Sequence, residues 1–399
     1  MCSILGGTSF DDVSVTIFNK AKDRGRDFSG MVQRGSNWIA NHRATPTNEL
    51  EDPIENQPLG QGIKLVHNGT IANDEELGYK EGEIDSSVLV GALDWTDLES
   101  WAKSFQRIKG SFAIAALVRG EIWLACNYKP IFYTLHEGEF YFSSLENHLP
   151  GRWVQRMRPY SVMNLVTGEW YDIIREQSKK ALVVCSGGLD STAVAGFVRN
   201  RHFTTTLLHF DYGCKATDRE IESIKQIAKF LECDYKILPI EYKHFHGQST
   251  LFKEDNIETG KAGVEYALDW VPARNTLMLA SAAAYAEAHN YGHIYLGTNL
   301  EESGAYPDNE EQYIRDFNKM MYGVVNEGKK IEIKAPLGGL MKREIVSFGV
   351  EHNSPLHLSY SCYNGRDKHC GACGPCYMRQ KAFLRAGQPD PTEYEQKIK

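Results

Sequence analysis

The sequence predicts a chain of two domains, with a β-rich first half and a second half built on a parallel α/β sheet. Its 399 residues are enough for two or three domains of roughly 100–200 residues each. In the first half, short apolar runs are bounded by Gly, Asn and charged residues, as strands usually are. In the second half, apolar runs alternate with helix-like segments, which is typical of a parallel sheet. The polar segment 167–180 is the expected boundary.

The composition favours a small-molecule substrate over a nucleic acid. The formal net charge is -8 at pH 7, whereas a protein that grips a phosphate backbone usually presents a basic face. The N-terminus lacks the features of a signal peptide, and no segment approaches the roughly 18 apolar residues of a membrane helix. We therefore expect a cytoplasmic protein, in its own cell or in a host cell if viral, with no membrane partner.

The apolar runs also give the order of the expected elements. The first half should contain strands at 63–67, 112–118, 122–126 and 139–142. In the second half, the continuous apolar run 181–185 predicts a buried parallel strand. The other expected strands are 204–210, 235–238 and 293–296, and the expected helices are 191–200, 217–231 and 275–289.

Cys2 comes directly after the initiator methionine, and removal of Met1 would make it the N-terminal residue. A free α-amine has a pKa of about 8, so it can act as a base beside its own thiol. One residue would then supply both nucleophile and base. A lone Met-Cys start more often marks an ordinary residue at a frayed terminus, so a catalytic role for Cys2 needs support from the rest of the first half.

Several short motifs come after Cys2 in a fixed order. They are His42-Arg43, His67-Asn68-Gly69, Ile-Asp-Ser-Ser-Val at 84–88, Lys-Gly-Ser-Phe-Ala at 109–113 and Phe-Ser-Ser-Leu-Glu at 142–146. In this order they resemble class II glutamine amidotransferases, the N-terminal-nucleophile family, and the resemblance covers residues 2–150. It implies an α+β sandwich of αββα layers, with the domain at 2–170. A degenerate, inactive glutaminase-like domain is the alternative.

The resemblance gives each of these motifs a role. Cys2 would be the nucleophile that releases ammonia from glutamine. Arg43 would hold the glutamine carboxylate, and Asp85 would hold its α-amine. The Asn68 side-chain amide and the Gly69 N–H would form the oxyanion hole, whose donors stabilise the charge that develops when a thiolate attacks an amide.

A glycine-rich segment, Ser-Gly-Gly-Leu-Asp-Ser at 186–191, comes after the expected strand 181–185 and precedes a helix. Such a turn gathers backbone N–H groups and the positive end of a helix dipole onto one anion. It lacks the Gly-Lys-Ser/Thr of a Walker A loop. It resembles the PP-loop of ATP pyrophosphatases, whose parallel-sheet fold is adenine nucleotide α-hydrolase-like.

This second resemblance implies that ATP, with Mg²⁺, is cleaved between its α- and β-phosphates to adenylate a substrate oxygen. Lys342 matches a lysine that PP-loop families place near the phosphates, although its spacing fits a solvated surface lysine nearly as well. The other residues implied to bind ATP are Ser186, Gly187, Gly188, Asp190 and Ser191.

Four cysteines lie close together near the C-terminus, at Cys362, Cys370, Cys373 and Cys376. In a cytosolic chain such a cluster predicts a metal site rather than disulfides. Four thiolates suit one tetrahedral zinc ion with no open position, which would make the site structural. An iron–sulfur cluster and a metal-free cluster are the alternatives.

Further segments of the second half agree with this cluster. They are Phe-Asp-Tyr-Gly at 210–213, Val-Pro-Ala-Arg-Asn at 271–275, Gly-Ala-Tyr-Pro-Asp at 304–308 and Ser-Cys-Tyr-Asn-Gly at 361–365. Together they resemble 7-cyano-7-deazaguanine synthases, which implies a domain at 178–399 with a zinc knuckle at 362–376. The chain departs from the family's usual residues at Leu189, Cys214 and Ala273.

The same resemblance implies three substrate-binding residues, Arg274, Tyr306 and Asp308. Asp308 is a natural hydrogen-bond acceptor for the N–H edge of a deazaguanine, and Arg274 could face a carboxylate or a phosphate. Both also suit ordinary structural roles, as a helix cap and as a surface charge.

The two resemblances imply a glutamine-hydrolysing, ATP-dependent carbon–nitrogen ligase of queuosine and archaeosine biosynthesis. Ammonia from glutamine would convert an ATP-activated 7-carboxy-7-deazaguanine into 7-cyano-7-deazaguanine. The alternative is an archaeosine-type synthase, which adds ammonia to the nitrile of a 7-cyano-7-deazaguanine base in tRNA or DNA to give a formamidine. A non-catalytic nucleobase-binding protein and an asparagine-synthetase-like ligase are weaker alternatives. Glutamine and a deazaguanine are the expected partners, while a nucleic acid and a homodimer stay open.

Overall fold

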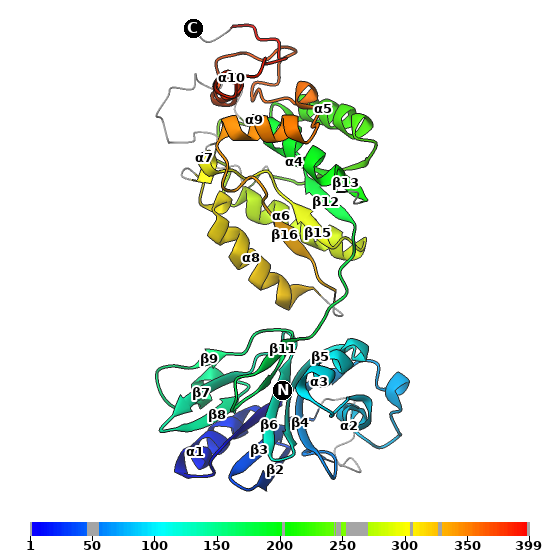
Figure 1. Cartoon of the computed structure of the whole chain (residues 1–399), viewed down its shortest axis with the longest axis vertical. Coiled ribbons are helices and arrows are strands. Elements are labelled where there is room, and N and C mark those ends of the chain that lie inside the picture. Colours follow the sequence, from blue (N-terminus) through cyan, green and yellow to red (C-terminus); the bar gives the residue numbers. More distant parts are fainter. Residues whose placement is uncertain are drawn as a thin grey trace. The chain divides into compact units, whose positions relative to one another are not determined.

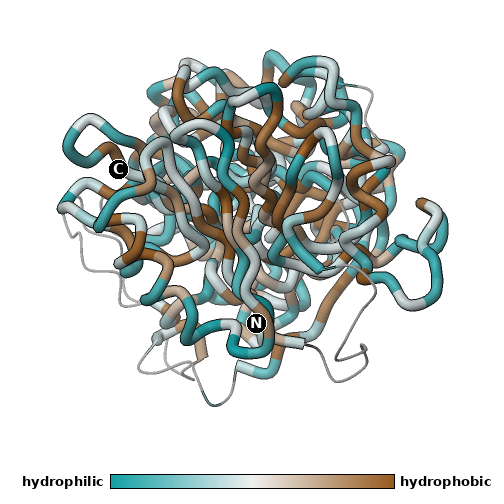
Figure 2. Tube along the Cα trace, turned by 90° about the horizontal axis from the view of Figure 1, so that it is seen from below, coloured by the Kyte–Doolittle hydropathy of each residue, from teal (hydrophilic) through white to brown (hydrophobic). Residues whose placement is uncertain are grey.

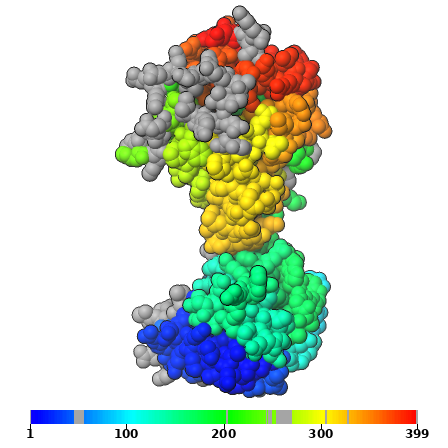
Figure 3. Space-filling view, turned by 90° about the vertical axis from the view of Figure 1, so that its left-hand side faces the viewer, coloured from blue at the N-terminus to red at the C-terminus, as the bar shows by residue number. Residues whose placement is uncertain are grey.

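The computed structural model describes residues 2–45, 56–201, 204–242, 244, 249–252, 270–303, 306–325 and 329–396. The chain divides into two compact units, Met1–Glu176 with Tyr322–Gly328, and Gln177–Met321 with Lys329–Lys399. Figure 1 and Figure 3 trace the chain by colour, from the blue N-terminus to the red C-terminus. Among the described residues, no helix has the length and apolar character that crossing a membrane requires.

The first unit contains two antiparallel sheets. One has the strand order β2-β3-β1-β8-β7-β9, and the other has the order β11-β10-β6-β5-β4. The strands are β1 (Ser3–Gly7), β2 (Phe28–Arg34), β3 (Asn37–Arg43), β4 (Lys64–Ile71), β5 (Gly110–Val118), β6 (Glu121–Cys126), β7 (Phe132–His136), β8 (Glu139–Ser143), β9 (Gln155–Arg156), β10 (Ser161–Asn164) and β11 (Trp170–Asp172). The helices are α1 (Asp12–Ala21), α2 (Leu89–Ala92) and α3 (Leu98–Ser104).

Alternation along the strands explains how these elements are layered. Successive side chains of a strand point to opposite faces of its sheet. In β5, Ala113 and Leu117 join an apolar core between the two sheets, whereas Ile114 joins a second core with α2 and α3. A third core packs α1 against the other sheet, and Figure 1 shows α1 on the opposite side from α2 and α3. These layers confirm the predicted αββα sandwich.

The second unit is built on one parallel sheet with the strand order β14-β13-β12-β15-β16. Its class is therefore the predicted parallel α/β class. The strands are β12 (Ala181–Val184), β13 (Thr205–Asp211), β14 (Asp234–Pro239), β15 (His293–Tyr295) and β16 (Glu332–Lys334). The helices are α4 (Leu189–Arg199), α5 (Thr217–Phe230), α6 (Arg274–Ala288), α7 (Leu300–Ser303), α8 (Glu311–Val324), α9 (Lys342–Glu351) and α10 (Gly374–Arg385). The end of α8, from Tyr322 on, counts with the first unit.

The strand order reverses direction at β12, which has β13 on one side and β15 on the other. In open parallel sheets, ligands bind beyond the carboxyl ends of the strands at such a point. Residues 185–188 come after β12, and residues 296–299 come after β15, so both segments lie at this end of the sheet. Figure 2 colours the tube by the hydropathy of each residue and shows that hydrophobic and hydrophilic stretches alternate along the chain.

Candidate active sites

Cys2 lies directly before β1, the strand between β3 and β8 in the first sheet. Ser3 pairs with His42 in the antiparallel register of β1 and β3, so one further residue sets Cys2 beside Arg43. The Cys2 Sγ is 3.7 Å from the Ala44 carbonyl oxygen, its side chain is partly buried, and Arg43 is buried. The register therefore brings the predicted nucleophile and the predicted carboxylate-binding arginine together.

Gly69 lies on β4, which is the edge strand of the second sheet. The N–H groups of an antiparallel strand alternate between the neighbouring strand and the open edge. Three N–H groups on this edge have acceptors. The Leu65 N–H donates to the Leu59 carbonyl at 3.1 Å. The His67 N–H donates to the Gln57 Oε1 at 2.6 Å, and the Ile71 N–H donates to the Asp85 Oδ2 at 2.6 Å. The Gly69 N–H faces the same edge, and no described residue accepts it. This donor is free for an oxyanion.

The backbone around Gly69 has no room for a side chain. A Cβ at this position would lie 1.9 Å from the Ser111 carbonyl oxygen and 2.7 Å from the His67 Nε2. Any other residue would displace β4 from β5 and move the N–H group. Glycine is therefore required here by packing, while the backbone stays in a strand.

Asn68 is buried beside Gly69, and its Nδ2 is 3.5 Å from the Ser144 Oγ. The same Oγ accepts the Ile4 N–H at 2.9 Å, so Ser144 links Asn68 to the strand that begins next to Cys2. Ser144 was not predicted as a site residue, because 142–146 served only as a motif of the resemblance. A buried serine at a strand end carries no signal that would single it out.

The segment 186–191 contains the turn between β12 and α4 and the first three residues of α4. Gly187 has φ +77°, a left-handed conformation that glycine adopts without steric cost. Gly188 is the N-cap of α4, and no side chain caps the first-turn N–H groups. The hydroxyls of Ser186 and Ser191 are 3.3 Å apart at this turn. The loop thus presents backbone and hydroxyl donors at a helix N-terminus, which suits a phosphate.

Lys342, the first residue of α9, is tied to this loop. Its Nζ contacts the Asp190 carboxylate and lies 2.6 Å from the Glu302 Oε1, while the Asn299 Nδ2 donates to Asp190 at 3.1 Å. The Lys342 side chain is only 13% exposed, so it is not a solvated surface lysine. Burial alone would lower its pKa, but the two carboxylates raise it, which keeps the ammonium charged.

Asp308 and Arg274 lie at the N-terminus of α6. The Asp308 Oδ2 accepts the Asn275 N–H at 3.3 Å, so this carboxylate caps the helix from another segment. The Arg274 Nη1 is 3.5 Å from the Tyr212 hydroxyl. The helix-cap interpretation of Asp308 is therefore correct for one of its oxygens, and burial raises the pKa of the group.

Two aromatic rings border the same region. Trp270 and Tyr306 stack with ring centroids 5.7 Å apart and planes 13° apart. The Asn275 Nδ2 donates to the Asn309 Oδ1 at 2.7 Å, which ties the segment before α6 to the segment after Tyr306. The three residues predicted to bind substrate thus come from two joined segments. Trp270 was missed because it lies just outside the motif at 271–275.

Glu220 of α5 is a second residue that was not predicted from the sequence. It is buried, its Oε2 is 4.0 Å from the His209 Nε2, and burial raises its pKa to about 7, which the nearby Arg274 partly offsets. The sequence does contain a pattern that could have predicted its burial. Glu220 precedes Ile224 and Ile227 at the spacing of one helix face, and both isoleucines are buried. A glutamate on an apolar helix stripe indicates a buried carboxylate, which needs a functional or structural explanation.

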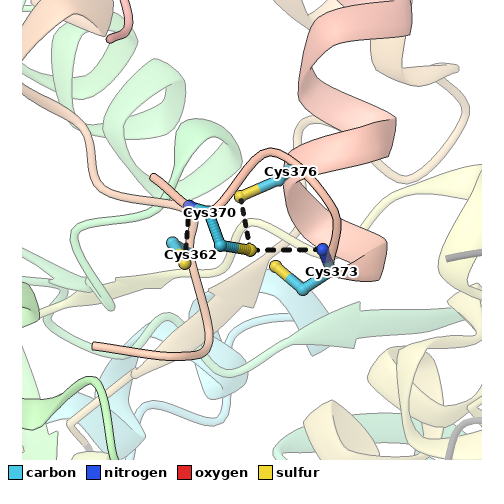
Figure 4. Close-up of side chains that lie close together, drawn as sticks. All are labelled: Cys362, Cys370, Cys373 and Cys376. Carbon is cyan, nitrogen blue, oxygen red and sulfur yellow. Dashed lines mark hydrogen bonds between the residues drawn. The ribbon is translucent and has the colours of Figure 1, made fainter. Parts of the chain in front are cut away.

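The four cysteines form one buried cluster (Figure 4). Their Sγ atoms all lie within 4.8 Å of one another, and those of Cys370 and Cys376 are 3.9 Å apart. Sulfurs about 2.3 Å from a tetrahedral zinc ion would be about 3.8 Å apart, so the spacing fits. The Cys373 N–H donates to the Cys370 Sγ at 3.3 Å, and the Cys370 N–H donates to the Cys362 Sγ at 3.4 Å, as thiolate ligands require.

Comparison with known families gives two matches. Residues 180–387 match the queuosine biosynthesis protein QueC, and residues 44–150 match a glutamine amidotransferase domain. The two matches fall on the two halves of the chain.

Three relatives carry related names. The 7-cyano-7-deazaguanine synthase 2 of Sulfurisphaera tokodaii is 36% identical over 463 aligned positions, which cover 99% of this chain and 100% of the relative. The 7-cyano-7-deazaguanine synthase of Sulfolobus acidocaldarius is 41% identical over 90% of this chain and 84% of its own length. The enzyme of the same name from Methanocaldococcus jannaschii is 39% identical over 54% of this chain and 99% of its own length.

Proposed function

Because the chain belongs to the QueC family of 7-cyano-7-deazaguanine synthases and carries a glutamine amidotransferase domain, we propose that it feeds ammonia from glutamine into nitrile synthesis. Its substrates are glutamine, ATP as the Mg²⁺ complex and a 7-carboxy-7-deazaguanine. The observation that carries the proposal is the placement of Cys2 beside Arg43, in the same unit as an edge strand with a free Gly69 N–H.

The first half-reaction takes place in the first unit. With Met1 removed, the α-amine of Cys2 accepts the thiol proton, and the thiolate attacks the side-chain amide of glutamine. The amide oxygen becomes an oxyanion that accepts hydrogen bonds from the Gly69 N–H and the Asn68 side-chain amide. Arg43 binds the substrate carboxylate, and Asp85 binds its ammonium. The α-ammonium of Cys2 returns its proton to the departing nitrogen, ammonia leaves, and water then releases glutamate from the Cys2 thioester.

The second half-reaction takes place in the second unit. A carboxylate repels nucleophiles and has a poor leaving group, so it needs activation. The carboxylate of the deazaguanine attacks the α-phosphate of ATP, while the loop 186–191 binds the departing pyrophosphate. Ammonia displaces AMP and loses a proton to give an amide. The amide oxygen then attacks the α-phosphate of a second ATP, pyrophosphate departs, and the oxygen leaves with AMP while the nitrogen loses its two protons, which gives the nitrile.

Charged residues position the reactants of this second step. Lys342 holds Asp190 at the first turn of α4, which fixes the shape of the loop. Arg274, Tyr306 and the Asp308 carboxylate contact the deazaguanine. The four cysteines would hold one zinc ion in a closed tetrahedral site that stabilises the fold and takes no part in the chemistry.

The test is mass spectrometry of the products formed from glutamine, ATP and 7-carboxy-7-deazaguanine. We expect the nitrile, AMP and glutamate from the wild type. The Cys2→Ala variant should lose the reaction with glutamine and keep it with ammonium salts. Conversion of a 7-cyano-7-deazaguanine base, free or in tRNA or DNA, to a formamidine without AMP formation would overturn the proposal in favour of the archaeosine-type reaction.

A further inference from the structure

Helix α5 packs directly against the phosphate-binding loop at Gly187. The Glu220 carbonyl oxygen lies 3.0 Å from the position that a Cβ of Gly187 would take, and the Ser223 Oγ is 3.1 Å from the Gly187 carbonyl oxygen. The side chain of Glu220 is buried, and its Oε2 is 4.0 Å from the His209 Nε2. A buried acid therefore lies on a helix that touches the loop.

His209 connects this acid to the start of the loop. It lies on β13, and its Nδ1 is 3.1 Å from the carbonyl oxygen of Cys185, the residue that precedes Ser186. A carbonyl oxygen can only accept, so the Nδ1 carries a proton and donates it. Burial lowers the pKa of His209, which keeps the ring neutral and leaves a lone pair on the Nε2.

The lone pair on the His209 Nε2 needs a donor. No residue in the described part of the chain forms a hydrogen bond with this nitrogen, and the side chain is 2% exposed. An ionised Glu220 can only accept, whereas a protonated Glu220 has one O–H to donate. A hydrogen bond requires a separation of about 3 Å, so a small movement of the Glu220 side chain would form it. Protonation of Glu220 would thus satisfy a buried acceptor that otherwise destabilises the fold.

The charges around Glu220 leave its proton finely balanced near neutral pH. Burial raises the pKa of Glu220 to about 7, the positive charge of Arg274 acts against this effect, and the negative charge of Asp211 adds to it. A further negative charge nearby would therefore favour the protonated form at physiological pH.

The other titratable groups around this carboxyl group do not change charge near neutral pH. Burial raises the pKa of the Cys214 thiol to about 11, and it also raises the pKa of Cys185 and of Tyr212. These three side chains therefore stay protonated, and His209 stays neutral, while Glu220 titrates.

Phosphates that bind to the loop bring several negative charges close to α5. We propose that Glu220 is a positioning residue of the ATP site, and that its carboxyl group takes up a proton when the phosphates bind and donates it in a hydrogen bond to the His209 Nε2. This bond completes a chain from α5 through His209 to Cys185, which holds the start of the loop in place. The inference rests on the proposed function of the second unit and deepens it, because it makes the affinity for ATP depend on pH.

The test is titration calorimetry with the Mg²⁺ complex of α,β-methylene-ATP, which cannot be cleaved between its α- and β-phosphates. The wild-type affinity should fall about tenfold from about pH 6 to pH 9, which corresponds to a rise in the Glu220 pKa from about 7 to about 8 on binding. At about pH 7.5 the complex should then take up about half a proton per nucleotide. Two buffers with different ionisation enthalpies measure this uptake.

Two substitutions of Glu220 separate the hydrogen bond from the charge. The Glu220→Gln variant has an NH₂ group that can donate to the His209 Nε2 at every pH. It should keep the wild-type affinity measured at low pH, and its pH profile should show only the titration of the nucleotide itself. The Glu220→Met variant has neither charge nor donor, so it should bind about tenfold more weakly than Glu220→Gln at every pH.

Glu222 supplies the matched control. It lies on the same helix, but its side chain is exposed and its Oε1 accepts the Gln226 Nε2 at 2.9 Å. The Glu222→Gln variant should therefore keep the wild-type pH profile and the wild-type proton uptake.

The outcomes separate the inference from the proposed function. A wild-type affinity and proton uptake that match those of Glu220→Gln at every pH overturn the inference, and so does equal binding by Glu220→Gln and Glu220→Met. A wild type that binds no nucleotide at any pH overturns the proposed function itself. If the variants do not fold, infrared difference spectroscopy of the wild type decides: a protonated carboxyl band that grows on nucleotide binding supports the inference, and its absence refutes it.

Discussion

The two candidate sites are built in opposite ways. In the first unit, the Gly69 N–H lies on the edge strand β4 and the Cys2 thiol lies directly before the interior strand β1, and neither a backbone amide nor a thiol needs an ion pair to hold it. In the second unit, Lys342 is buried between Asp190 and Glu302 next to the phosphate-binding loop. Truncation of the partly buried Cys2 side chain should therefore leave the fold intact, whereas removal of the buried Lys342 charge should reduce stability and activity together.

The largest effect is expected from Cys2→Ala. Glutamine-dependent product formation should fall by about a thousandfold or more, because the nucleophile is gone. Synthesis from ammonium salts and the midpoint of thermal unfolding should stay as in the wild type, since the Cys2 side chain is only partly buried. Glutamate release and product formation, measured with both nitrogen sources, check this. Loss of the ammonium-supported reaction would show that the two sites do not work separately.

The Lys342→Met variant tests the site in the second unit, which contains buried charges. It leaves the Asp190 and Glu302 carboxylates without their cation, so synthesis should fall with glutamine and with ammonium alike, and the free energy of unfolding should drop by about 3 kcal/mol. Urea unfolding measures the second effect. The matched control is Lys334→Met, because the Lys334–Glu332 pair is 39% and 38% exposed and should contribute less than about 1 kcal/mol. Equal losses in the two variants would contradict the comparison.

The Glu220→Gln variant tests how a buried carboxyl group makes the stability of the second unit depend on pH. Burial raises the pKa of Glu220 from its ordinary 4.5 to about 7, so the folded state binds this proton more tightly than the unfolded state does. That contribution to stability is complete below pH 4.5 and is lost as the pH rises through about 7. Relative to the wild type, Glu220→Gln should therefore gain stability across this window, by up to about 3 kcal/mol. Urea unfolding at several pH values checks the sign, and a difference that is independent of pH would contradict it.

The smallest effect is expected at Ala273, which stands where the resembled synthases have glycine. Ala273 has φ +51°, a left-handed conformation that is strained for alanine, at the N-cap of α6. Ala273→Gly should stabilise the protein by about 1 kcal/mol. Ala284→Gly, at an exposed position inside the same helix, should cost about 1 kcal/mol instead. Thermal unfolding of the two variants should therefore shift in opposite directions.

Much of the fold is encoded in local patterns of the sequence. The apolar run 181–185 appears as β12, and the helical periodicity of 217–231 appears as α5 (Thr217–Phe230). The cysteine spacing predicted one cluster, and the four sulfurs do lie together. These features depend on residues that are close in the chain, so a short window of sequence contains the information.

The features that the sequence could not predict depend on pairing between distant residues. The strand expected at 63–67 continues to Ile71, although Asn and Gly are rare in strands, because β5 pairs with β4 along this whole length. The placement of Cys2 beside Arg43 results from the register of β1 and β3, which no local pattern encodes. The capping of α6 by Asp308 likewise joins two segments that are distant in the sequence, and no local pattern predicts that they come together.

The edge position of β4 has one more consequence. An exposed edge strand is a template for aggregation, because its unpaired N–H and C=O groups invite another chain to add on as a further strand. Here Leu59, Gln57 and Asp85 already occupy the outward N–H groups of residues 65, 67 and 71, so a foreign strand would find a single donor among the described residues. One donor is too few to start a sheet, yet it is enough to bind the oxygen of a single amide. The same three blocked positions thus protect the edge against a foreign strand and leave one donor, which the proposed function assigns to the oxyanion.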